Sequence, residues 1–133
     1  MSKNPRGTAI IINNQKFVHT DMYPFRDGAD VDANNLEKLF SQLDFEVSKH
    51  ANLTRNATLK LMIDMAETVG SKPCDMLIVC ILSHGKDQGK IVSSDGLMID
   101  METDIFRLYI LLIVHFTNIT LSSEGSIMNI VLL

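Results

Sequence analysis

Residues 76–85 read Met-Leu-Ile-Val-Cys-Ile-Leu-Ser-His-Gly, and this stretch decides how the rest of the chain is interpreted. The apolar run, rich in Leu, Ile and Val, predicts a buried strand at 76–82. That strand delivers the imidazole of His84 to an edge of the sheet. Histidine is the commonest general acid or base, because its ordinary pKa lies near physiological pH. Gly85 beside it lets the backbone approach a substrate and leaves an N–H to face a developing oxyanion.

Shorter patterns before this strand predict an alternation of strands and helices. In chain order we expect a strand at 8–13, a helix capped by Asp30 with an apolar face of Leu36, Leu39, Phe40 and Leu43, a strand at 45–47, and a helix capped by Thr54 that carries Leu59, Met62, Ile63 and Ala66. This order predicts a parallel α/β sheet with helices on its faces. Functional groups gather outside the carboxyl ends of such strands, where His84 falls. Residues 91–99 are expected to form a β-hairpin.

The segment between the first strand and the first helix is a second candidate for function. Residues 14–29 lack periodicity and hold Pro24 and Gly28, which predicts a long surface loop. Long loops in compact domains are often functional. Arg26 lies in the middle of this loop, where a guanidinium is suited to bind a carboxylate through two hydrogen bonds. A solvated loop arginine is the alternative interpretation.

Composition is that of an ordinary globular domain and excludes several classes of function. The chain has 133 residues, a net charge of −4 and 46% hydrophobic residues, which fits one domain. No block of Lys or Arg marks a nucleic-acid surface. The apolar run at 105–116 is too short to cross a bilayer and is expected to be a buried helix or strand, so no membrane partner is predicted.

The two cysteines, Cys74 and Cys80, are too few for a disulfide framework, and their spacing fits no common metal site. Reduced thiols in a cytoplasmic protein are therefore expected, with no metal and no cofactor. The N-terminus lacks the apolar core of a secretory signal. For that reason we interpret the glycosylation sequons at 52–54, 56–58 and 118–120 as chance matches.

Several of these segments, taken in order and spacing, closely resemble the caspase family of cysteine endopeptidases. The matching stretches are 6–14, 26–36, 39–40, 43–47, 53–54 and 80–85, followed by Gly89, Ile91, Asp95 and Gly96. The likeness covers residues 6–105, the greater part of a caspase large subunit. It implies the caspase-like α/β fold, a three-layer sandwich whose sheet is incomplete here.

The resemblance assigns roles residue by residue. His84 matches the catalytic histidine, which protonates the leaving amine, and Gly85 matches the glycine whose N–H helps form the oxyanion hole. Arg26 matches the arginine that binds the substrate aspartate before the scissile bond. Pro24 falls where the family uses a main-chain carbonyl to orient the histidine. The implied partners are protein substrates with that aspartate, and other caspase chains.

The nucleophile that this chemistry requires is missing from the sequence. Caspases carry Gln-Ala-Cys about 50 residues after the histidine, but residues 85–133 hold no cysteine. Ser122, Ser123 and Ser126 lie in this segment; no motif places them against His84, and a hydroxyl is a far poorer nucleophile. We therefore expect a caspase large-subunit-like domain at 6–106, truncated before the catalytic cysteine, and a divergent apolar tail of unknown structure at 107–133.

Two functions remain open at this point. The first is a caspase-family endopeptidase domain that cleaves after aspartate in apoptotic proteolysis when complete, with this chain inactive alone. The second is a non-catalytic truncated isoform that binds and regulates caspases. An unrelated α/β binding module that matches by accident is a remoter third. The resemblance is lost after residue 106, and our hypothesis is that the tail is unrelated sequence joined there, such as a read-through intron or an alternative terminal exon.

Overall fold

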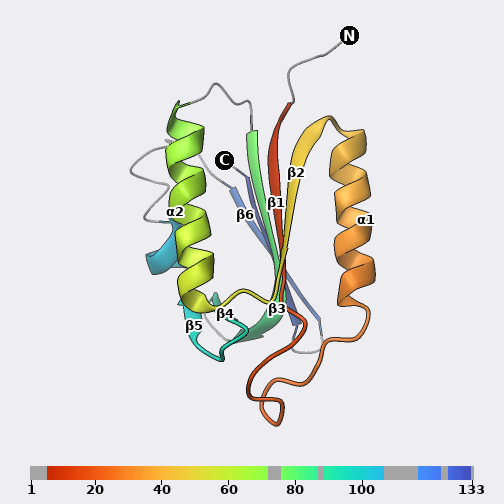
Figure 1. Ribbon diagram of the computed structural model, residues 1–133, viewed down its shortest axis with the longest axis vertical. Coiled ribbons are helices and arrows are strands. Elements are labelled where there is room, and N and C mark those ends of the chain that lie inside the picture. The colour runs from red at the N-terminus through yellow and green to blue at the C-terminus, as the bar shows by residue number, and fades with distance from the viewer. Residues whose placement is uncertain (1–5, 72–75, 87–88, 107–116, 124–125, 133) are drawn as a thin grey trace.

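The structure, a computed structural model, describes residues 6–71, 76–86, 89–106, 117–123 and 126–132 and has a central sheet with a helix on each face (Figure 1). Its elements are β1 (Gly7–Asn13), α1 (Ala29–Gln42), β2 (Phe45–Ala51), α2 (Arg55–Ser71), β3 (Met76–Lys86), β4 (Lys90–Val92), β5 (Met98–Asp100), the π-helical turn η1 (Met101–Phe106), β6 (Thr117–Ser123) and β7 (Ser126–Leu132). Strand β1 is parallel to both β2 and β3. The predicted parallel α/β arrangement is therefore confirmed.

Alternation along the strands divides the apolar core into two layers. The layer on the α2 side contains Ile10, Ile12, Met62, Leu77, Val79 and Ile81. The layer on the α1 side contains Ala9, Ile11, Ala33, Phe40, Ile78, Cys80 and Leu82. Because β1 and β3 are covered on both faces, their sequences are continuous apolar runs rather than alternating ones.

Helix α1 begins at Ala29 and has Gly28 as its N-cap residue. Gly28 has a φ of 78°, and no side chain caps the helix, so the prediction that Asp30 is the cap was wrong. A left-handed backbone at this point suits glycine, which lacks the Cβ that makes positive φ costly. Asp30 lies in the first turn instead, where a carboxylate favours the positive end of the helix dipole.

The buried stripe of α1 also differs from the predicted one. It comprises Ala29, Ala33 and Phe40, with Leu36 partly buried beside them. The prediction was correct for Leu36 and Phe40 and wrong for Leu39 and Leu43, which are 47% and 41% exposed. Small alanine side chains allow the helix to lie close to the sheet, and this turns the two leucines toward solvent.

Helix α2 is capped as predicted. The Thr54 hydroxyl oxygen accepts the N–H of Ala57 at 3.2 Å. Met62 is fully buried and Leu59 packs beside it, as expected, whereas Ile63 is 45% exposed and was wrongly assigned to the core. Ala66 lies among the residues whose side chains the structure does not describe.

Strand β3 continues beyond its predicted end at residue 82 and reaches Lys86. Strand β1 accompanies it only as far as Leu82, the register partner of Asn13. Beyond that point β3 pairs with β4, and Gly85 lies opposite Ile91. His84 therefore lies past the carboxyl end of β1, at the predicted edge of the parallel sheet.

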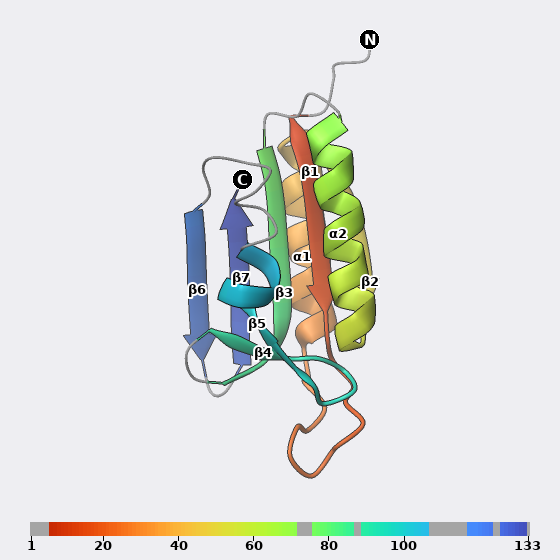
Figure 2. The same ribbon diagram turned by 90° about the vertical axis from the view of Figure 1, so that its left-hand side faces the viewer.

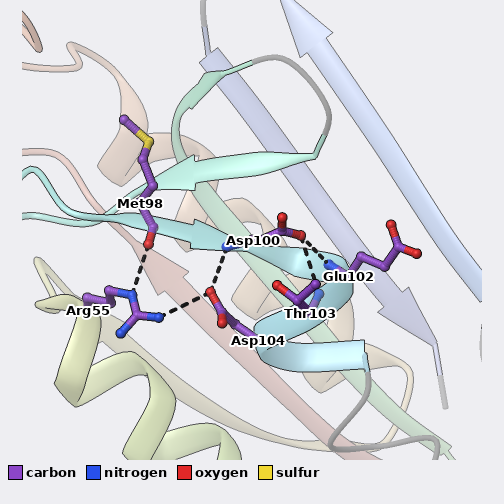
Figure 3. A network of polar contacts seen from close by, with 6 residues as sticks. All are labelled: Arg55, Met98, Asp100, Glu102, Thr103 and Asp104. Carbon is purple, nitrogen blue, oxygen red and sulfur yellow. Dashed lines mark hydrogen bonds and ion pairs between the residues drawn. The ribbon is translucent and has the colours of Figure 1, made fainter.

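The predicted hairpin forms from β4 and β5, which pair antiparallel. A polar network fastens it to α2 (Figure 3). Arg55 donates from Nε to the carbonyl of Met98 at 2.9 Å, and its Nη2 lies 3.3 Å from the Asp104 carboxylate. The same carboxylate accepts the N–H of Asp100 at 2.9 Å. This network fixes the strand that supports β4, and through β4 the end of β3.

The C-terminal segment extends the sheet past β3. Strands β6 and β7 form an antiparallel hairpin, and β7 pairs antiparallel with residues 78–84 of β3 (Figure 2). Most of the apolar run expected to be buried, residues 107–116, lies outside the described residues. We predicted no structure for residues 117–133, whose hairpin covers the edge of β3 that β1 leaves open.

Candidate active site

His84 is held by a main-chain carbonyl that lies 60 residues earlier in the chain. Nε2 of its imidazole is 2.7 Å from the carbonyl oxygen of Pro24. A carbonyl only accepts hydrogen bonds, so Nε2 carries the proton in this contact. In the neutral ring the lone pair is then on Nδ1, which is the nitrogen left to take up or deliver a proton.

Two aromatic side chains of the loop between β1 and α1 pack against the same imidazole. The ring centroids of Phe17 and Tyr23 lie 4.9 and 5.9 Å from that of His84. Both aromatic rings are buried and form a small cluster with Val92 of β4. The loop therefore supplies both the hydrogen bond and the packing surface that restrict the orientation of the imidazole.

Arg26 lies two residues after Pro24 and closes the same loop. Its backbone N–H is donated to the carbonyl of Gln15 at 3.1 Å, and its Nη1 donates to the carbonyl of Asn14 at 3.0 Å. Burial lowers the pKa of the half-buried guanidinium from its ordinary value, and the carboxylate of Asp32 opposes that shift. Arginine keeps its charge at neutral pH under such conditions. A cation is thus fixed by the loop that orients the histidine.

Cys80, the free cysteine within the described residues, is not placed to serve His84. It precedes His84 by four residues on one extended strand, so the Cα atoms of the two residues are about 13 Å apart. Burial also raises the pKa of its thiol to about 12. At neutral pH only about one molecule in 10⁵ then carries the thiolate that is the nucleophilic form. Cys74 lies outside the described residues.

Comparison with known protein families gives a match that spans most of the chain. The caspase domain matches residues 6–123. The chain belongs to the caspase family. The expected fold is present, and so is the expected contact between the histidine and a main-chain carbonyl.

Curated caspases from animals as different as rodents and nematodes are similar to this chain. Caspase-3 of Mesocricetus auratus is 42% identical over 104 residues, which is 76% of this chain and 36% of that protein. Caspase-3 of Felis catus is 38% identical over 90 residues, 68% of this chain and 32% of that protein. Caspase A of Caenorhabditis elegans is 32% identical over 110 residues, 82% of this chain and 19% of that protein. The chain spans about a third or less of the length of these relatives.

The neighbours of His84 along β3 are fixed by the strands that pair with β3. The fully buried Ser83 donates its hydroxyl to the carbonyl of Val92 in β4. Gly85 lies in the same strand with Ile91 of β4 as its register partner. Ser126 of β7 is the register partner of His84. No sequence motif indicated that pairing, which brings one of the three tail serines to the level of the histidine.

Neither a metal centre nor a membrane span is found in the described part of the chain. It contains no cluster of three or more His, Cys, Asp or Glu side chains that could hold a metal ion. No helix there is long and apolar enough to cross a membrane. Acidic residues do gather at η1, but Asp104 of that group is paired with Arg55.

Sequence reasoning missed the residues that surround the histidine rather than the histidine itself. Phe17 and Tyr23 were passed over, although two aromatic residues in a loop already predicted to be functional were an available signal. Asn52, which binds the start of this loop, was considered only as part of a sequon. Its contacts join residues 36 and 37 positions apart, which no local pattern reveals.

Proposed function

We propose that this chain carries the imidazole half of a caspase Cys–His dyad, with His84 as the general acid and base. Gly85 is the oxyanion-hole residue of the proposal, and Arg26 binds the substrate aspartate. The contact of 2.7 Å between Nε2 and the Pro24 carbonyl carries the proposal. It supports the assignment because it leaves Nδ1 as the nitrogen that exchanges protons with a nucleophile and a leaving group.

The reaction follows from these roles. A thiolate attacks the main-chain carbonyl carbon of the substrate aspartate, and a thioester forms as the bond from that carbon to the next residue's nitrogen breaks. His84 delivers a proton to the departing amine, and water then hydrolyses the thioester and restores the thiol. Arg26 offers two N–H groups in the geometry that matches a carboxylate. The proposed substrates are therefore polypeptides with an aspartate before the cleaved bond, in apoptotic proteolysis.

The 133-residue chain is proposed to be inactive when it is alone. Residues 85–133 contain no cysteine, and Cys80 is buried with a pKa of about 12. A hydroxyl is a far weaker nucleophile than a thiolate without strong activation, so the register of Ser126 does not replace a thiol.

A fluorogenic aspartyl peptide tests this proposal directly. We expect no turnover above the uncatalysed rate at high concentrations of the purified chain. Turnover that disappears in His84→Ala contradicts the inactivity and reveals a nucleophile. A Ser126→Ala variant then decides whether that nucleophile is the serine in register with the histidine.

The second candidate function is regulation of complete caspases by this chain. It is favoured by the combination of a loop that holds His84 in place and a sequence with no thiol after it. Addition of the chain to a complete caspase from the same source distinguishes the two functions. If the activity of that caspase falls or rises to a plateau as the concentration of the chain increases, the result favours regulation. A cleavage rate of the complete caspase that is unchanged at every concentration of the chain favours the first function, an endopeptidase domain that is inactive when alone.

Two further expectations belong to this proposal. The caspase-like unit is proposed to occupy residues 6–106, with 107–133 as unrelated sequence joined to it, and the protein is proposed to be cytoplasmic. Sequencing of transcripts across codon 106 tests the first expectation. Transcripts that all encode this tail, with none that continues to Gln-Ala-Cys, exclude a processing artefact. Fluorescence of the tagged full chain in cells tests the second.

A further inference from the structure

The loop that carries Pro24 and Arg26 is tied at its start to the turn between β2 and α2. The side-chain oxygen of Asn52 accepts the backbone N–H groups of Gln15 and Lys16, both at 2.9 Å. The backbone N–H of Asn52 is itself donated to the carbonyl of Asn13, the last residue of β1, at 3.0 Å. Asn52 thus contacts the chain on both sides of the point where β1 becomes the loop.

Gln15 connects this anchor to Arg26. Its N–H is donated to Asn52, and its carbonyl accepts the N–H of Arg26 at 3.1 Å. The Arg26 guanidinium donates to the carbonyl of Asn14, whose side-chain oxygen accepts the N–H of Leu53 at 3.0 Å. Residues 14–15 and 26 therefore close the loop against each other, and the turn at 52–53 holds the closed end.

The choice of residue at position 52 has a local physical reason. Asn52 has a φ of 55°, a left-handed conformation that Asn adopts more readily than most residues other than glycine. Its side chain is exposed, so burial does not explain it. Thr54, the other polar residue of the sequon, caps α2. Both sequon residues thus have roles in the fold itself.

We propose that Asn52 is a positioning residue of the site, which acts through Gln15 on Arg26 and on the Pro24 carbonyl that holds His84. The roles of Arg26 and His84 in this inference rest on the proposed function. The contacts of Asn52 do not depend on that function. An experiment therefore has to observe the loop and the peptide-binding residue separately.

Three variants of the full chain separate the acceptor from the backbone conformation. Asn52→Gly keeps the freedom to adopt positive φ and removes the acceptor. Asn52→Asp keeps an acceptor oxygen at the same position and serves as the conservative rescue. Asp44→Gly is the matched control, because Asp44 also has a positive φ, of 66°, and lies at the end of α1 away from this loop.

Amide hydrogen exchange and the imidazole proton of His84 report on the loop. In Asn52→Gly we expect exchange at Gln15, Lys16 and Arg26 to accelerate about tenfold relative to core amides of β3, as loss of one modest hydrogen bond predicts. The Nε2 proton signal of His84 is expected to broaden in the same variant. Asn52→Asp and Asp44→Gly are expected to match the wild type in both measurements.

Titration with a blocked aspartyl peptide, followed by NMR, reports on Arg26. We expect Asn52→Gly to bind it several-fold more weakly and Asn52→Asp to bind it normally. The positioning role is wrong if the loop amides of Asn52→Gly accelerate no more than the core amides, or if Asn52→Asp is as damaging. If the variants differ in exchange as expected but the wild type does not bind the peptide, the proposed role of Arg26 is wrong and the role of Asn52 is unaffected.

Discussion

The buried thiol of Cys80 makes the stability of this fold sensitive to alkali. Burial raises its pKa from 9.0 to about 12, so the folded state favours the protonated thiol. The stability that this provides is fully present below pH 9, the unfolded value, and is lost as the pH rises from 9 towards 12. Within that window each pH unit costs about 1.4 kcal/mol, since one unit of pKa difference corresponds to that free energy.

Urea unfolding of the wild type and Cys80→Ala, at pH 8 and near pH 10.5, measures this loss. We expect the wild type to lose about 2 kcal/mol more than the variant between the two pH values. Every other ionisable side chain is common to the two proteins, so its effect cancels in the difference. At pH 8 the variant is expected to be less stable by about 1–2 kcal/mol because of the cavity it leaves.

Thiol labelling supplies the complementary test. In a Cys74→Ser background the remaining thiol is expected to resist a thiol reagent in the native state and to react fully in urea. Equal pH dependence of wild type and Cys80→Ala refutes this reasoning, as does native labelling at the rate of an exposed thiol. Either result also reopens Cys80 as a thiol available to chemistry.

Three further substitutions test the parts of the fold that support the site. Arg55→Met keeps the aliphatic stem and is expected to cost about 2 kcal/mol in urea unfolding; a double-mutant cycle with Asp104→Asn should give a coupling of about 1 kcal/mol that weakens with salt. Ser83→Ala removes a buried hydrogen bond between β3 and β4 and is expected to cost about 1–2 kcal/mol, and unchanged stability contradicts that bond. Gly96→Ala introduces a Cβ at a φ of 84° and 2.6 Å from the ring of His19. We expect a loss of about 2 kcal/mol, of which a second change, His19→Ala, restores only the part due to the contact.

The central sheet was predictable because its signals are local. Continuous apolar runs in β1 and β3 indicate strands buried on both faces, and the alternation with helical segments indicates parallel pairing. The position of His84 follows from where the run at 76–82 stops. The contact of His84 with Pro24 was predictable only through the family resemblance, since it joins residues 60 positions apart.

The predictions that were wrong or missing concern features that depend on contacts between distant parts of the chain. Hydropathy favours Leu39 over Ala33 as a core residue, but close approach of α1 to the sheet selects the smaller side chain. A side-chain rule for helix caps favours Asp30, yet the path of the loop requires a left-handed residue at Gly28. The tail has no clean period, so its pairing with β3 had no local signal to predict it.

The position of His84 also limits where any thiol can come from. Its imidazole is oriented by Pro24, Phe17 and Tyr23, all from the loop that precedes α1. None of these contacts requires a nucleophile, so the histidine is held whether or not a thiol is present. Because Nε2 is occupied by the Pro24 carbonyl, the nucleophile that the proposed function requires has to approach Nδ1. A thiol from another segment or another chain must therefore arrive from the side of the ring that faces away from that carbonyl.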